Sequence, residues 1–119
     1  MTNLFDESKS IHCGMPVDTG VGALIMPSGW KGRLGEFKHS APIELRTANG
    51  KVLQGETCWP VKIEIDGFRP VSNEVVFLDM GDDEAAHKPL LGYVVLAQAQ
   101  AAVDMPGHRL VPVRYIDMK

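Results

Sequence analysis

The sequence predicts a mostly β protein with one helix near its C-terminus. Two turn dipeptides, Asn49-Gly50 and Asp66-Gly67, lie between residues of strand character. Tyr93 to Ala102 is rich in Ala, Leu and Gln and is the only segment with the composition of a good helix. No repeat with a period of roughly 20–50 residues occurs, which excludes solenoids and propellers. Small barrels and sandwiches both remain open on pattern alone.

The first half of the chain predicts a short strand, a loop and a hairpin. The apolar run from Val21 to Met26 stops at a proline, as a short strand would. The glycine-rich stretch from Ser28 to Gly35 predicts a loop with one short helical turn. Pro42 to Thr47 and Val52 to Thr57 flank Asn49-Gly50. That dipeptide indicates a hairpin, because both central residues of a type I′ turn need positive φ.

The second half predicts four further strands, one of which is the short apolar stretch Leu90-Leu91-Gly92. Val61, Ile63 and Ile65 alternate with polar residues, which is typical of a half-buried strand. We expect Val71 to Leu78 to be a second strand and residues 80–88 to be a surface loop. Arg109 to Ile116 is the final strand, in which a proline favours an edge position.

Length and composition indicate one soluble globular domain. The chain has 119 residues, of which 45% are hydrophobic and 23% charged. Residues 1–12 are polar and unpatterned, so we expect a flexible N-terminal arm before a single domain over residues 13–119. A chain of this length can bury a core without disulfides or metals.

Charge and cysteine usage exclude several classes of protein. The net charge of −3 and the pI of about 5.7 provide no electrostatic attraction to nucleic acid. Cys13 and Cys58 form no disulfide framework, which favours free thiols in a reducing compartment. No segment reaches the ~18 consecutive apolar residues that span a bilayer, and no signal-peptide pattern opens the chain. We therefore expect a cytoplasmic protein without a membrane partner.

The first candidate for chemistry is Asp18-Thr19-Gly20. The carboxylate would lie in a tight loop that the threonine hydroxyl locks by hydrogen bonding, and the glycine allows backbone to approach it closely. Taken alone, the tripeptide is better explained as an ordinary Asx-type turn.

The order of motifs around this triplet resembles that of the retropepsin-like aspartic proteases, and most closely their small bacterial and archaeal single-domain members. The resemblance covers Val17 to Val113, and its pieces read VDTGVGALIMP, LRTANGKVLQG, KPLLGYVVLAQAQAAVD and HRLVPV. It implies a closed, barrel-like β fold with one C-terminal helix. Each piece is short, and the specificity comes from their order.

The resemblance also implies a homodimeric endopeptidase without metal or cofactor. Enzymes of this family use two aspartates that share one proton, because two like charges so close together cannot both ionise. This chain has a single Asp-Thr-Gly. Asp18 of each subunit would therefore supply one catalytic carboxylate, with Thr19 and Gly20 holding its geometry. The substrate would be a peptide or protein.

Further residues of the expected site follow from the same resemblance. The hairpin around Asn49-Gly50 would be a flap over the substrate, although a plain surface hairpin explains the pattern equally well. Leu90-Leu91-Gly92 would lie beside the catalytic loop and help form its psi-shaped crossing. The flap residues are Ala48, Asn49, Gly50 and Lys51, and the apolar pocket residues are Leu24, Ile25, Val76 and Leu90.

The chain departs from the family pattern at several positions, which keeps other functions open. Val21 follows the triplet, where the family usually has alanine, and Tyr93 stands where retroviral members have arginine. The stretch before Asp18 reads HCGMPV and is short for an N-terminal hairpin. One alternative is a catalytically silent dimer that binds peptides, and another is a small barrel in which Asp18 is a turn residue. His12 and Cys13 lack the spacing of a metal site.

Overall fold

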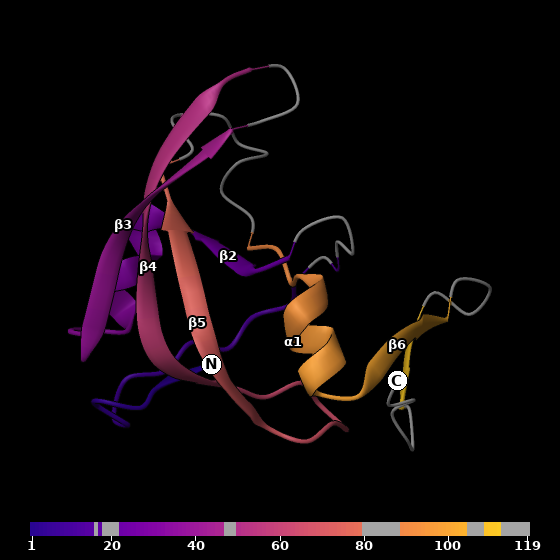
Figure 1. Ribbon diagram of the computed structural model, residues 1–119. Helices are drawn as coiled ribbons and strands as arrows, with labels where there is room; N and C mark the ends of the chain where they lie inside the picture. Colours follow the sequence, from indigo (N-terminus) through magenta and orange to yellow (C-terminus); the bar gives the residue numbers. More distant parts are fainter. Residues whose placement is uncertain (16, 18–21, 47–49, 80–88, 105–108, 113–119) are drawn as a thin grey trace, which may run out of the picture.

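The structure is a computed structural model that describes residues 1–15, 17, 22–46, 50–79, 89–104 and 109–112 (Figure 1). Most of the described secondary structure is strand, which confirms the mostly β prediction. None of the helices in these residues has the length and apolar content to span a bilayer. In chain order the elements are β1 (Thr2–Asn3), β2 (Leu24–Pro27), the 3-10 helix η1 (Ser28–Arg33), β3 (His39–Arg46), β4 (Val52–Ile63), β5 (Val71–Leu78), α1 (Tyr93–Gln98), β6 (Ala101–Asp104) and β7 (Arg109–Pro112).

Five strands form the main sheet, in the order β1-β4-β5-β2, with β3 also paired to β4. The pairing of β2 with β5 is parallel, and the other pairs are antiparallel. β6 and β7 form a separate antiparallel pair. Over the described residues the main sheet does not close into a barrel.

The longest strand, β4, organises the sheet because it pairs along both edges. Its first part pairs with β3, and Val61 and Lys62 pair with β1. Its other edge pairs with β5, with a register shift between Cys58 and Val61. The sequence predicted separate strands before and after Cys58. They form one strand because the irregularity at residues 58–61 lets the chain continue along β5.

The hairpin of β3 and β4 confirms the prediction around Asn49-Gly50, but its register differs from that of a two-residue turn. Arg46 pairs with Val52, which leaves the five residues 47–51 between the strands. A two-residue turn at Asn49-Gly50 would place Arg46 opposite residue 53 instead. Gly50 has a φ of 82°, a value that a glycine adopts without steric cost.

The main sheet has two apolar faces, because successive residues of a strand point to opposite sides. We call one the core face, defined by Leu24, Met26, Cys58, Val75 and Phe77, all buried in the large hydrophobic cluster. We call the other the hairpin face, defined by Ile25, Val76 and Leu78, which are buried, and by Ile43, Leu45, Leu53 and Leu90, which are partly buried. Leu34 completes the cluster on the core face, together with residues of α1 and of the N-terminal segment.

The N-terminal segment packs against the sheet, where the sequence predicted a flexible arm over residues 1–12. Met1 and Ile11 are buried in the large cluster, and each donates a backbone hydrogen bond to the other's carbonyl. The buried Asn3 side-chain amide donates to the carbonyl oxygens of Leu34 and Glu36, at 2.7 Å each. The few apolar residues of the segment and one satisfied amide therefore suffice to hold a short hairpin.

The helix begins where the sequence predicted but ends sooner. α1 stops at Gln98, and β6 occupies Ala101 to Asp104, the end of the predicted helix. The chain turns at Gln100, whose φ is 57°. Val95, Leu96 and Ala99 are buried, so packing of this short apolar stripe rather than length stabilises the helix. The last strand is confirmed for residues 109–112, and residues 113–116 lie outside the described part.

Candidate active site

The predicted catalytic residues Asp18, Thr19 and Gly20 lie outside the described residues, but the chain on both sides of them is described. Val17 forms a parallel bridge with Leu91. Ile25 forms an antiparallel bridge with Leu90, through backbone hydrogen bonds of 2.9 and 2.8 Å. Two consecutive residues, Leu90 and Leu91, thus hold the chain on both sides of the triplet.

A third contact ties the same region to the start of α1. The backbone N–H of Val94 donates to the carbonyl of Gly22, at 3.0 Å. Gly22 is the second residue after Gly20 in the sequence. The segment from 90 to 94 therefore anchors the chain just before and just after the triplet.

The closed end of the β3–β4 hairpin extends past β5. β5 ends at Leu78, opposite Gly55, so the hairpin continues for three residues of β4 beyond the last pair with β5. Figure 1 shows this end projecting from the sheet. Of the predicted flap residues, Gly50 and Lys51 are described and exposed, whereas Ala48 and Asn49 lie outside the described residues.

The hairpin face brings together three of the four predicted pocket residues. Ile25, Val76 and Leu90 belong to one apolar cluster. Leu24 does not join them, because it points to the core face and is 0% exposed. The difference follows from strand alternation, which places Leu24 and Ile25 on opposite sides of β2.

Three further residues of this face were missed by the sequence analysis. Ile43, Leu45 and Leu53 come from the hairpin and pack against the same cluster. The alternation of Ile43 and Leu45 with polar neighbours indicates that both side chains lie on one face of a strand. Only the pairing of β3 with β4 shows which face of the sheet that is. Gly55 pairs with Ile43 on one side and with Leu78 on the other, and an added Cβ would clash with the Phe77 carbonyl oxygen and the Leu78 side chain.

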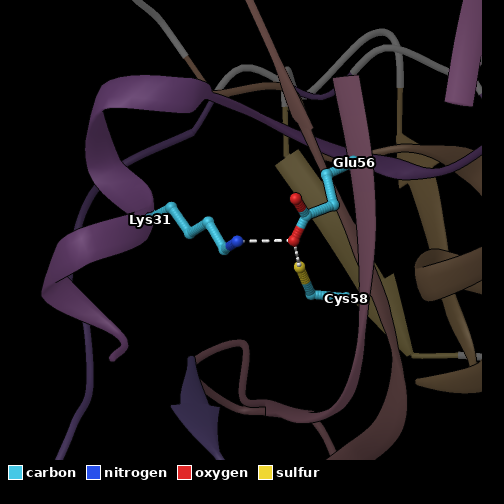
Figure 2. A network of polar contacts seen from close by, with 3 residues as sticks. All are labelled: Lys31, Glu56 and Cys58. Carbon is cyan, nitrogen blue, oxygen red and sulfur yellow. Dashed lines mark hydrogen bonds and ion pairs between the residues drawn. The ribbon is translucent and has the colours of Figure 1, made fainter. Parts of the chain in front are cut away.

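A polar network on the other side of β4 was also not predicted (Figure 2). Lys31 Nζ, from η1, donates to Glu56 Oε1, and the thiol of Cys58 donates to the same oxygen at 3.3 Å. The hydrogen bond from Lys31 lowers the pKa of Glu56, and the bond to Glu56 raises the pKa of Lys31. Burial, with the nearby Glu56 carboxylate, raises the pKa of Cys58 to about 12.

These shifts indicate a structural role for Cys58. A thiol with such a pKa is almost entirely protonated at neutral pH, whereas nucleophiles and metal ligands need the thiolate. Cys13 is exposed, and partial burial raises its pKa as well. Within the described residues no cluster of three or more His, Cys, Asp or Glu side chains could hold a metal ion.

A pocket of about 670 Å³ opens between the N-terminal segment, the β4–β5 turn and β7. Its wall includes Met1, Ile11, Phe68 and Leu110, with His12, Cys13, Glu64 and Asp66 among its polar residues. Val17 and Leu91 border it, but none of the predicted flap or pocket residues that the structure describes does. The pocket is therefore separate from the hairpin face.

Comparisons with the profiles of known protein families, with curated proteins and with solved structures give no match to this chain.

Proposed function

We propose that the chain is one subunit of a homodimeric aspartic endopeptidase, in which each subunit contributes Asp18. One carboxylate would act as base and activate a water molecule, while the other would protonate the substrate carbonyl or the leaving amine. Thr19 and Gly20 would hold each carboxylate in its loop.

The observation that carries the proposal is the arrangement of backbone around the triplet. Val17 and Ile25 pair with Leu91 and Leu90, respectively. This pairing is what the motif order VDTG…LLG requires if the triplet forms a rigid loop at the end of a strand. An ordinary surface turn would need no such anchorage on both sides.

Two other features support the same function. The hairpin end beyond β5 has the position in the chain that a flap requires, and a flap would exclude bulk water from the reaction. The partly buried Ile43, Leu45 and Leu53 would offer apolar contacts to a bound peptide. An extended peptide would add main-chain hydrogen bonds like those of a strand.

The proposal includes the finer features expected from the family resemblance. The complete chain would close into a barrel-like fold, and the dimer would act in the cytoplasm without metal or cofactor. The alternative is a dimer that binds peptides without hydrolysing them. The β-branched Val21, next to the triplet, favours that alternative because it adds bulk beside the catalytic loop.

The test is peptidase activity on a denatured protein substrate across acidic and neutral pH, comparing the wild type with Asp18→Asn. Asp66→Asn, at the exposed β4–β5 turn, is the matched control for removing one aspartate charge. We expect Asp18→Asn to abolish hydrolysis and Asp66→Asn to leave it unchanged. Hydrolysis that survives in Asp18→Asn would exclude the aspartic mechanism, and binding without hydrolysis in the wild type would support the silent dimer.

A further inference from the structure

Large hydrophobic side chains are exposed at few places on the described surface, and three of them gather beside the triplet. Val17, Tyr93 and Val94 are 37%, 59% and 44% exposed. Val17 precedes Asp18 in the sequence and bridges to Leu91, two residues before Tyr93. The Val94 N–H bonds to Gly22, on the far side of the triplet. We call these three residues the apolar patch.

The helix that carries two of these residues exposes apolar side chains as well as burying them. Val95 and Leu96 of α1 are buried in the core cluster, whereas Tyr93, Val94, Ala97 and the polar Gln98 are exposed. A surface helix normally presents polar and charged residues to water. The N-terminal end of α1, where Tyr93 and Val94 are exposed, therefore has the composition of a covered surface.

The segments that meet at the patch also lack charge. The fifteen residues from Pro89 to Val103 contain no Asp, Glu, Lys or Arg. Between Ser10 and Trp30, Asp18 is the only such residue. Depletion of charge together with an exposed tyrosine is the composition of the central part of a protein–protein interface.

We propose that the apolar patch is the surface through which two copies of this chain associate. The inference rests on the proposed function, because a shared proton requires the two Asp18 side chains to meet at a two-fold axis. Consecutive Cα atoms are about 3.8 Å apart, so both Val17 residues would lie near that axis. In a two-fold symmetric interface the same patch of each subunit faces its own copy. An apolar patch can pack against its copy, whereas a charged patch would be repelled by the like charge.

The test compares the dimer dissociation constants of variants that place a charge on the patch. Tyr93→Arg and Val94→Arg should each weaken the dimer at least about tenfold, because burying an unpaired charge at an interface core is costly. Phe5→Arg is the matched control: Phe5 is 57% exposed but belongs to the N-terminal segment. Sedimentation equilibrium from about 1 to 100 μM measures each constant, and near-UV circular dichroism shows whether each variant is folded.

The outcomes separate this inference from the proposed function. A folded Tyr93→Arg, Val94→Arg double variant that dimerises like the wild type would overturn the patch and leave the peptidase proposal standing. A wild type that dimerises through the patch but hydrolyses nothing would overturn the peptidase proposal alone. A wild type that is monomeric at the highest concentration would overturn the patch as a self-association surface. Equal weakening by Phe5→Arg would also overturn it, because the effect would not be specific to the patch.

Discussion

The two faces of the main sheet are built from the same strands but are covered in different ways. On the core face, Leu34, α1 and the N-terminal segment bury the side chains of β2, β4 and β5. On the hairpin face, Ile25, Val76 and Leu78 are buried, but the surrounding residues of the hairpin are only partly so. The comparison teaches that one face stabilises the fold, while the other retains apolar surface that a ligand could cover.

The largest effect should come from a truncation on the core face. Phe77 is buried there and its ring centroid lies 5.9 Å from that of Phe37. We expect Phe77→Ala to lower the free energy of unfolding by about 3–5 kcal/mol, through lost apolar burial and the cavity left behind. Urea denaturation measures this, with the exposed Phe5→Ala as control, for which we expect a change within about 0.5 kcal/mol. A similar loss in both variants would mean that burial does not distinguish these sites.

A truncation on the hairpin face should separate stability from function. Leu45 is partly buried, so Leu45→Ala should lower the free energy of unfolding by only about 1 kcal/mol. If the hairpin covers a peptide, the same change should reduce kcat/KM by about tenfold, since it removes apolar contacts worth about 1.4 kcal/mol.

Glu44→Ala provides the matched control for this variant. Glu44 neighbours Leu45 but is exposed, and it accepts a hydrogen bond from Gln54. Its loss should leave kcat/KM within about twofold, because an exposed hydrogen bond outside the apolar cluster contributes little. The two-face interpretation fails if Leu45→Ala reduces stability as much as Phe77→Ala and leaves turnover unchanged.

The smallest effect should come from the ion pair of Lys31 with Glu56. Both side chains remain substantially exposed, at 40% and 37%, so Lys31→Met should cost less than about 1 kcal/mol at neutral pH. Folding lowers the pKa of Glu56, so this contribution is present above the carboxylate's unfolded pKa, near 4.5, and is lost as pH falls through the folded value. It is also lost at high pH, above 10.5, as pH rises through the raised pKa of Lys31.

The measurement is the difference in unfolding free energy between the wild type and Lys31→Met, followed from neutral to acidic pH. The exposed Lys38, substituted in the same way, controls for the change in net charge. A Lys31→Met difference that grows as the pH falls would contradict the assigned role of the ion pair.

Local signals in the sequence predicted much of the fold. Turn dipeptides and alternating residues identified the β3–β4 hairpin, and β5 has the predicted bounds from Val71 to Leu78. The helical turn in η1 and the start of α1 were predicted from composition. These features depend on neighbouring residues, whose preferences can be read without knowing what they contact.

The features that were missed depend on distant partners. The burial of Met1 and Asn3 requires Ile11 and the carbonyls of Leu34 and Glu36. The end of α1 at Gln98 reflects the start of β6, which pairs with β7. The hairpin has five residues between its strands, whereas the Asn49-Gly50 dipeptide predicted a two-residue turn.

By itself, therefore, the sequence determined the mostly β class, the hairpin, the late helix and the single Asp-Thr-Gly, because each depends on residues that are close together in the chain. Only the tertiary structure decided that Leu90 pairs with Ile25 and Leu91 with Val17, and that Ile43, Leu45 and Leu53 join Ile25 and Val76 on one face. It also decided that the backbone N–H of Val94 donates to the carbonyl of Gly22. The physical reason is that strand pairing and register bring together residues separated by 18 to 74 positions, and no local preference encodes which partners they find.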